Sequence, residues 1–309
     1  MTAYMMITRL WQAGMVGHIF LGLDNKHVRI LNAADGRPIG TITLGFTPLA
    51  SGVDERRGRA LFVGPGPTGA GHLVVFDTRD GHVLWKTTAG LDPSVVAVDT
   101  RQGHVFVGSA GPGPGPGACA FQGGFCALGS VSMLDIRDGH VLHTVNVGQN
   151  PASIVTDEQT QRVFAVSAGA NQSDIGTVSV LDARTGALLR TTTVGYGATG
   201  AAVDVRRARV YVANGNSGTV SVLDARNGQL LGALRVTAGP LAVAVDERTD
   251  RVLVSSADVS GGIAQTHQAS SRSVMDQIGF LEAEVSNEMR VLRKGQTGTV
   301  SVFDAQKAP

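Results

Sequence analysis

The segment TVSVLDARTG at residues 177–186 recurs as TVSVLDARNG at residues 219–228, 42 residues further along and with one position changed. A fixed internal period dictates a repeat architecture, so it must be settled before any single motif is judged. Each copy has an alternating β-branched run, then Asp, then Gly, which predicts a strand, a tight turn and a second strand. The Asp side chain can close such a turn on backbone N–H groups, and Gly accepts a positive φ there.

The same hairpin can be followed through the chain. Further copies are HLVVFDTRDGHVL (72–84), SVSMLDIRDGHVL (130–142), HVRILNAADGRPI (27–39) and TVSVFDAQ (299–306). A second strand pair lies between the hairpins, as in SVVAVDTRQGHVFVGSA at 94–110. Four short, apolar strands in about 42 residues are typical of a propeller blade. The sequence therefore predicts an all-β fold, a six-bladed β-propeller of four-stranded antiparallel blades that forms a single domain over residues 1–309.

The sixth repeat is incomplete. It has apolar strands at 241–246, 251–257 and 299–304, and no further apolar strand follows for the outer position. Many closed rings pair strands from the two termini. We therefore expect the N-terminal AYMMITRL (3–10) to be either the first inner strand or the last outer one.

Composition excludes several partner classes. The chain has 26 Lys and Arg against 25 Asp and Glu, a formal charge of +1, with no block of like charge, which argues against nucleic acid. No apolar run approaches the roughly 18 residues that a membrane span needs. GHIFLG at 17–22 matches GHVFVG at 103–108, so we assign the N-terminal apolar segment to the repeat and not to a signal peptide.

The segment VYVANGNSGTVSVLDARNGQLLGALRV (210–236) resembles the YVTN-type β-propeller repeat, with Tyr211-Val212-Ala213-Asn214 at the place of the namesake motif. The resemblance covers most of residues 17–305. Members of that family are mostly extracytoplasmic or cell-surface proteins, often without an assigned activity. The resemblance therefore implies an extracytoplasmic or cell-surface location, with the cytoplasm as the alternative. Trp85 resembles the tryptophan-docking repeat of quinone-cofactor dehydrogenases in one blade only, so we expect no cofactor.

Asp residues end two sets of strands, one residue per blade in the same turn context. They are Asp54, Asp99, Asp157, Asp204 and Asp246 after inner strands, and Asp77, Asp135, Asp182 and Asp224 after third strands. This regularity favours structural turns over calcium ligands or catalytic acids. Five of the eight His residues follow Gly at strand starts, without the convergence that a metal site needs. We therefore predict no metal site.

Two insertions interrupt the repeat. The first, GPGPGPGACAFQGGFCALG (111–129) in the third blade, alternates Gly and Pro and is expected to be a projecting loop. It holds the only two cysteines, Cys119 and Cys126, which favours a disulfide and an oxidising compartment; two incidental thiols of a cytosolic protein are the alternative. Phe121 and Phe125 lie between them and would form an apolar tip.

The second insertion, 258–298 in the sixth blade, is predicted to contain one helix. Ser273 to Asp276 resembles a capping box that would begin the helix, and Gly295 would end it. The apolar residues fall on one helical face, at Val274, Ile278, Leu281, Val285, Met289 and Leu292. This face either packs on the propeller or contributes to a site for a partner or ligand.

Strand order predicts where a site lies. Both insertions follow a second strand, and the third and sixth blades of a six-bladed ring are opposite each other. The insertions should therefore flank the channel mouth on one face, with the turns at 148–151, 195–198 and 237–240 between them. The candidate binding residues are Phe121, Phe125, Asn150, Tyr196, Ile278, Leu281 and Val285.

The strands expected around the channel, such as PSVVAV (93–98) and ATGAAV (198–203), carry no charged side chain or His. Propeller lactonases need metal-binding polar groups there. We therefore predict a non-enzymatic, monomeric binding or scaffold platform for a protein or cell-envelope component. The alternative is a lactonase-like small-molecule hydrolase or lyase, with a site at the channel mouth under the 258–298 insertion and polar groups from His267, Glu282, Glu284 and Glu288.

Overall fold

The structure is a computed structural model, and it describes residues 6–9, 18–22, 26–32, 34–66, 69–111, 128–171, 173–236, 239–257, 287–293 and 296–308. Within these ranges every regular element is a β-strand, and no helix occurs. The strands form six four-stranded antiparallel sheets. The prediction of an all-β fold built from four-stranded antiparallel units is confirmed.

In the first five sheets the strands are hydrogen-bonded in chain order. Sheet 1 contains β1 (Met6–Arg9), β2 (His18–Gly22), β3 (His27–Asn32) and β4 (Pro38–Thr43). Sheet 2 contains β5 (Ala50–Asp54), β6 (Arg59–Pro65), β7 (Ala70–Asp77) and β8 (Val83–Leu91). Sheet 3 contains β9 (Pro93–Asp99), β10 (His104–Ser109), β11 (Gly129–Asp135) and β12 (Val141–Val147).

The later sheets repeat this pattern, and the last departs from it. Sheet 4 contains β13 (Pro151–Asp157), β14 (Arg162–Ser167), β15 (Ile175–Asp182) and β16 (Leu188–Tyr196). Sheet 5 contains β17 (Ala198–Asp204), β18 (Arg209–Asn214), β19 (Thr219–Asp224) and β20 (Leu230–Arg235). Sheet 6 has the order β21 (Gly239–Asp246), β22 (Arg251–Ala257), β24 (Gln296–Asp304) and β23 (Asn287–Arg293).

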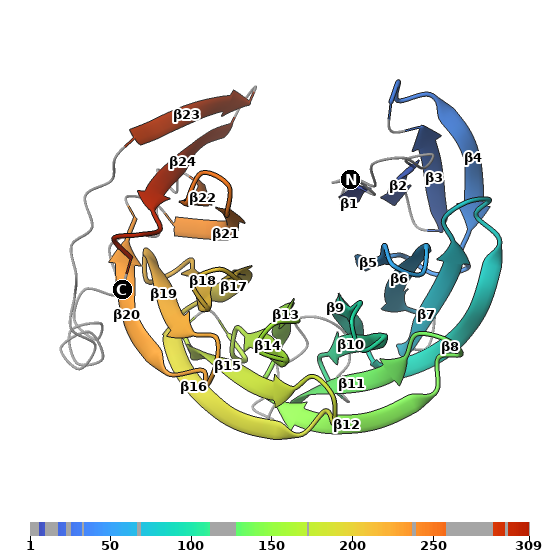
Figure 1. Cartoon of the computed structure of the whole chain (residues 1–309), viewed down its shortest axis with the longest axis horizontal. Helices are drawn as coiled ribbons and strands as arrows, with labels where there is room; N and C mark the ends of the chain where they lie inside the picture. The colour runs from blue at the N-terminus through green and yellow to red at the C-terminus, as the bar shows by residue number, and fades with distance from the viewer. Residues whose placement is uncertain are drawn as a thin grey trace.

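The sheets stand around a common centre, with the first strand of each sheet innermost (Figure 1). Neighbouring inner strands contact each other in sequence from β1 through β5, β9, β13 and β17 to β21. The result is an incomplete ring, with an opening between sheet 6 and sheet 1 (Figure 1).

Apolar clusters join each sheet to the next. Between sheets 4 and 5, for example, Phe164 and Val178 lie in one cluster with Val210 and Leu223, all fully buried. The other four clusters join sheets 1 and 2, 2 and 3, 3 and 4, and 5 and 6. Burying one such side chain contributes about 1.5–3 kcal/mol. Because most sheets are covered on both faces, their strands are apolar nearly throughout, which is why the repeat could be recognised.

The Tyr211-to-Asn214 segment forms most of β18 and is structural. Tyr211 is fully buried between sheets 5 and 6, and burial raises the pKa of its hydroxyl to about 12. The buried Asn214 amide donates to Thr219 Oγ1 at 3.1 Å and to Ser221 Oγ at 2.9 Å. Its Oδ1 accepts a hydrogen bond from the Gly195 N–H at 3.1 Å, which joins β18 of sheet 5 to the end of β16 in sheet 4.

The outer strand of each of the first five sheets has a β-bulge at its second residue. In sheet 4, Leu181 pairs with Leu188 and Val180 with Arg190, which leaves Leu189 unpaired. The same shift leaves Ile39, Leu84, Leu142 and Leu231 unpaired in the other sheets. A bulge twists an exposed edge and discourages further strand addition. The side chain is 51% exposed for Leu189 and 44% exposed for Leu142.

The prediction of a helix at 274–294 is wrong over residues 287–293. These residues form β23, which pairs with β24 from Asn287↔Val302 to Arg293↔Gln296. Residues 287–293 occupy the edge of β24 opposite β22, so pairing along the sheet outweighs the local helical period. The outer position of sheet 6 is therefore filled from the second insertion, while the N-terminal strand β1 is an inner strand.

The hairpin turn between β11 and β12 depends on glycine for two reasons. Gly139 has φ +76°, and a Cβ there would lie 2.6 Å from the ring of Trp85, whose Nε1 donates to the Ile136 carbonyl at 3.0 Å. Gly36 in the corresponding turn of sheet 1 has φ +70° but nothing within 4 Å of such a Cβ. Gly36 can therefore serve as the control for Gly139, since both have a positive φ and only Gly139 has a close neighbour.

We expect Gly36→Ala to cost about 1 kcal/mol from backbone strain alone. Gly139→Ala should cost about 1–3 kcal/mol more, because the methyl group also displaces Trp85. Urea unfolding of both variants measures the difference. Equal losses would mean that Trp85 does not pack on this turn.

Candidate functional site

The strand order gives the ring two faces, best followed in sheets 1 to 5. The loop face carries the connections from second to third strands and from each fourth strand to the next sheet. The turn face carries the connections from first to second strands and from third to fourth strands. Of the predicted site residues, Asn150 and Tyr196 lie on the loop face.

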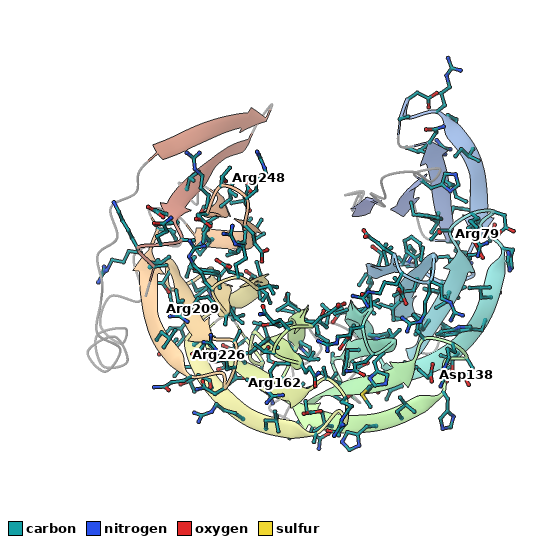
Figure 2. All side chains as sticks on the ribbon, in the orientation of Figure 1. Arg79, Asp138, Arg162, Arg209, Arg226 and Arg248 are labelled. Atoms are coloured by element: carbon teal, nitrogen blue, oxygen red, sulfur yellow. The ribbon has the colours of Figure 1, made fainter. Side chains whose placement is uncertain are left out.

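The turn face is strongly polar. Figure 2 shows charged side chains of this face around the ring, at Arg79, Asp138, Arg162, Arg209, Arg226 and Arg248. The strand-ending Asp residues accept backbone hydrogen bonds from their own turns. Asp54 Oδ1 accepts from the Arg57 N–H at 3.1 Å, and Asp204 Oδ1 accepts from the Arg207 N–H at 2.9 Å. The interpretation of these Asp rows as structural turns is confirmed.

Carboxylates on the turn face also bind the neighbouring sheet. Glu158 Oε1 in sheet 4 accepts hydrogen bonds from Thr100 of sheet 3, at 2.9 Å from its N–H and 2.6 Å from its hydroxyl. Glu247 Oε1 in sheet 6 accepts from the Val205 N–H of sheet 5 at 2.7 Å. These bonds join adjacent sheets at the ends of their inner strands.

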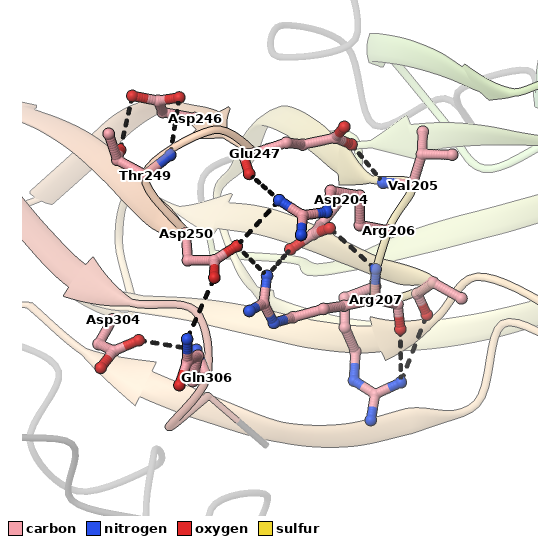
Figure 3. A network of polar contacts seen from close by, with 12 residues as sticks. Asp204, Val205, Arg206, Arg207, Asp246, Glu247, Thr249, Asp250, Asp304 and Gln306 are labelled. Atoms are coloured by element: carbon pink, nitrogen blue, oxygen red, sulfur yellow. Dashed lines mark hydrogen bonds and ion pairs between the residues drawn. The ribbon is translucent and has the colours of Figure 1, made fainter.

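Sheets 5 and 6 are joined by the network in Figure 3. Arg207 Nη1 donates to Asp250 Oδ1 of sheet 6 at 2.7 Å and to the fully buried Asp204 Oδ2 of its own sheet at 3.4 Å. Gln306 Nε2 donates to Asp250 Oδ2 at 3.1 Å. These donors, with Arg207 foremost, hold the pKa of Asp250 well below its usual range. The charged side chains of this network are therefore paired with one another at the junction of sheets 5 and 6.

A hollow of about 250 Å³ lies on the turn face between sheets 2 and 3. Its charged lining residues largely make hydrogen bonds to other groups of the protein. Arg57 donates to Asp54 and to the Thr100 carbonyl, and Arg137 Nη2 lies 2.5 Å from Asp135 Oδ2 and lowers the pKa of Asp135 to about 2. We assign no ligand to this hollow. Within the described ranges, no group of three or more His, Cys, Asp or Glu side chains could hold a metal ion.

The loop face has the opposite character. Its described connecting residues include only three charged side chains, Lys26, Asp92 and Asp174. Four large apolar side chains are exposed on it: Leu91 at 41%, Leu128 at 55%, Ile175 at 37% and Leu241 at 53%. The other exposed large apolar side chains of the described residues all lie at the starts of outer strands, beside the turn face. These four side chains come from sheets 2, 3, 4 and 6 and are candidate binding positions of a charge-poor face.

The connections of the loop face are tied to one another. The Ala110 N–H donates to the Asp92 carbonyl at 3.3 Å, and the Ala168 N–H donates to the Asn150 carbonyl at 3.1 Å. The Gly215 N–H donates to the Gly197 carbonyl at 2.9 Å. The same bond thus recurs in sheets 3, 4 and 5 and joins the two kinds of connection. In sheet 3 this hydrogen bond holds Ala110, the residue that directly precedes the first insertion.

The structure places both Asn150 and Tyr196 on the loop face, Asn150 in the connection before β13 and Tyr196 as the last residue of β16. Asn150 is exposed with φ +56°, and Tyr196 is half-buried. The other predicted site residues lie outside the described residues: Phe121, Phe125, Ile278, Leu281 and Val285, and with them Cys119 and Cys126. No sequence pattern singles out Leu91, Leu128, Ile175 and Leu241, whose only signal is an apolar residue at or beside the loop end of a strand.

The sequence of the chain matches a known protein family, and this match agrees with the repeat pattern and the sheet topology. The family model described as outer membrane protein assembly factor BamB matches residues 24–277. The chain belongs to this family. The match includes strands of all six sheets, from β3 to β22, and supports a β-propeller repeat fold. No curated protein sequence matches the chain.

A solved structure shares this BamB-family chain's fold. A chain of the structure entitled "Crystal Structure of Mitotic Checkpoint Complex" has a TM-score of 0.62 at 10% sequence identity, over 79% of this chain and 68% of that chain. At so low an identity the likeness shows the fold alone. Within the described ranges, no helix is long and apolar enough to cross a membrane.

Proposed function

We propose that the chain is a non-enzymatic β-propeller platform that binds a protein or another cell-envelope component through its loop face. The observation that carries this proposal is the exposure of Leu91, Leu128, Ile175 and Leu241 at or beside the loop ends of their strands, next to connections that are charge-poor and hydrogen-bonded together. Membership of a family named for an assembly factor supports a binding role.

The finer assignments belong to the same proposal. The repeats are of the YVTN type, six blades make up the ring, and the two insertions add Phe121, Phe125, Ile278, Leu281 and Val285 to the site beside Asn150 and Tyr196. The protein acts outside the cytoplasm, where Cys119 and Cys126 form a disulfide. Support comes from the namesake motif in β18, the six sheets and the family name.

The chemistry of the face defines how a partner would bind. With few charges on the connections, affinity should come mainly from burial of apolar surface, at roughly 25 cal/mol per Å² before the costs of association. Binding should therefore depend weakly on salt, because screening acts on charged pairs. A partner held by the turn face would show the opposite behaviour.

The test is affinity capture on immobilised protein from an extract of its own organism, followed by titration of the purified captured protein. We expect the double variant Leu128→Ser/Leu241→Ser to weaken binding about tenfold or more, which corresponds to about 1.4 kcal/mol. The matched control Leu142→Ser/Leu189→Ser removes similarly exposed leucines from the outer wall. It should bind as the unchanged protein does.

Both variants should keep their thermal unfolding midpoint, because the replaced side chains are exposed. Unchanged binding by the loop-face variant, or equal loss in the two variants, would overturn the proposal.

A further inference from the structure

Three arginines gather around one hairpin turn where sheets 4 and 5 meet on the turn face. Arg162, the first residue of β14, donates from Nε to the Arg226 carbonyl in the turn between β19 and β20, at 3.3 Å. Arg190, the third residue of β16, lies against the same turn, since a Cβ on Gly228 would be 3.5 Å from its Cδ. Figure 2 shows Arg162 and Arg226 near each other at this junction. Side chains from two strands of sheet 4 and from one turn of sheet 5 therefore converge.

The three guanidinium groups differ in how far the protein itself uses them. Arg162 is 27% exposed, and its Nη1 lies 3.5 Å from Asp182 Oδ2. Arg226 is 66% exposed, and its Nη1 lies 3.6 Å from Asp224 Oδ2. Arg190 is exposed, and no hydrogen bond or ion pair joins its guanidinium to another described residue. The junction therefore has one largely held positive charge beside two exposed guanidinium groups.

The same three places can be compared at the two preceding junctions. The first residue of each second strand binds a carbonyl of the next sheet's hairpin turn, and the third residue of each outer strand lies against the glycine of that turn. Between sheets 2 and 3 these places, with the turn residue, are Arg59, Trp85 and Arg137. Between sheets 3 and 4 they are His104, His143 and Arg184. Of these three junctions, only the one between sheets 4 and 5 has arginine at all three places.

The residue that follows the turn arginine increases this difference. It is an exposed acid in sheets 2 and 3, Asp80 and Asp138, and it is Asn227 in sheet 5. Oδ1 of each accepts a hydrogen bond from the N–H two residues further on, at 3.0, 3.0 and 2.8 Å. The turn of sheet 5 therefore keeps the same geometry but lacks the exposed carboxylate.

We propose that Arg190 and Arg226, with Arg162 beside them, bind a phosphate group at this junction. A guanidinium presents its N–H donors in a planar fork that fits two oxygens of a phosphate, and several guanidinium groups can bind one tetrahedral oxyanion from different sides. Asp182 and Asp224 leave part of this charge free, because two carboxylates face three guanidinium groups and each also accepts a backbone N–H of its own turn. The site lies on the turn face and is independent of partner binding at the loop face.

The phosphate is either a free ion or part of a lipid headgroup. Leu188 and Leu189 directly precede Arg190 and are 42% and 51% exposed. Exposed apolar side chains next to arginines suit an anionic membrane surface, where the arginines bind headgroups and the leucines enter the boundary with the acyl chains. The two sources therefore differ in whether the leucines contribute to binding.

Calorimetric titration with inorganic phosphate at constant ionic strength tests the site. We expect saturable binding that Arg190→Gln weakens about tenfold, because a charge-assisted contact is lost. Asn227→Asp should weaken it similarly, since it adds the carboxylate of sheets 2 and 3 to a turn that accepts it without refolding. Arg79→Gln is the matched control: Arg79 is a 76% exposed arginine in the equivalent turn of sheet 2, whose junction has His18 in the place of Arg162. A loss of the same size for Arg79→Gln would contradict the site, because the ion would then respond only to overall charge.

Sedimentation with vesicles distinguishes the two sources of phosphate. If the ligand is a headgroup, vesicles that contain phosphatidylglycerol should bind and vesicles of phosphatidylcholine alone should not. Leu188→Ser/Leu189→Ser should then weaken vesicle binding and leave the titration with inorganic phosphate unchanged. Binding of inorganic phosphate without vesicle binding would identify the free ion as the ligand. A protein that binds neither, or an Asn227→Asp variant that binds as the unchanged protein does, would refute the site.

Discussion

Phe164→Ala is expected to lower the free energy of unfolding by about 3–5 kcal/mol. Phe164 is fully buried between sheets 4 and 5, where it shares a cluster with Leu223 and Val210. Its removal loses the transfer free energy of the ring and leaves a cavity in a junction that cannot collapse without moving a whole sheet. Denaturant unfolding followed by circular dichroism measures the loss.

The matched control is Leu189→Ala. Leu189 is an apolar residue of the same region, but it lies in a bulge on the outer wall and is 51% exposed. We expect its replacement to change the unfolding free energy by no more than about 0.5 kcal/mol. A small loss at Phe164, close to that at Leu189, would contradict the assignment of the sheet junctions as the core.

Asp204→Ala is expected to cost about 3 kcal/mol. Asp204 is fully buried, its Oδ1 accepts from the Arg207 N–H at 2.9 Å, and its Oδ2 lies 3.4 Å from Arg207 Nη1. The substitution leaves the turn N–H without its acceptor and removes one side of the network that joins sheets 5 and 6. Urea unfolding at neutral pH measures the effect.

Asp224→Ala is the comparison for that variant. Asp224 occupies the equivalent place at the end of the third strand, where its Oδ1 accepts from the Arg226 N–H at 2.7 Å beside a solvent-exposed Arg226 side chain. Its loss should cost about 1 kcal/mol or less, since the exposed ion pair adds little. Similar losses for Asp204 and Asp224 would mean that the network between sheets 5 and 6 adds no stability.

The repeat could be predicted because its information is local. In TVSVLDARNG the strand, the Asp that closes the turn and the Gly with positive φ are adjacent in sequence, and Asp224 and Gly228 have those roles in the structure. The position of β23 could not be predicted in this way. Met289 and Leu292 fit a helical period, yet residues 287–293 pair with the open edge of β24, a feature that no local pattern records.

The candidate site was predictable in its location and not in its apolar residues. Strand order alone places Asn150 and Tyr196 on the loop face. Leu91, Leu128, Ile175 and Leu241 could not be told from core residues in strands that are apolar nearly throughout. Their exposure depends on the register at each strand end, as at Ile175, which pairs with Tyr196 at the rim.

The most direct test of the binding surface is photo-crosslinking to the captured partner. A photoreactive amino acid replaces Leu241 on the loop face in one variant and the exposed Asp138 on the turn face in another. We predict a crosslinked species with the partner from position 241 and none from position 138. A crosslink from position 138 alone would contradict the assignment of the loop face as the binding surface.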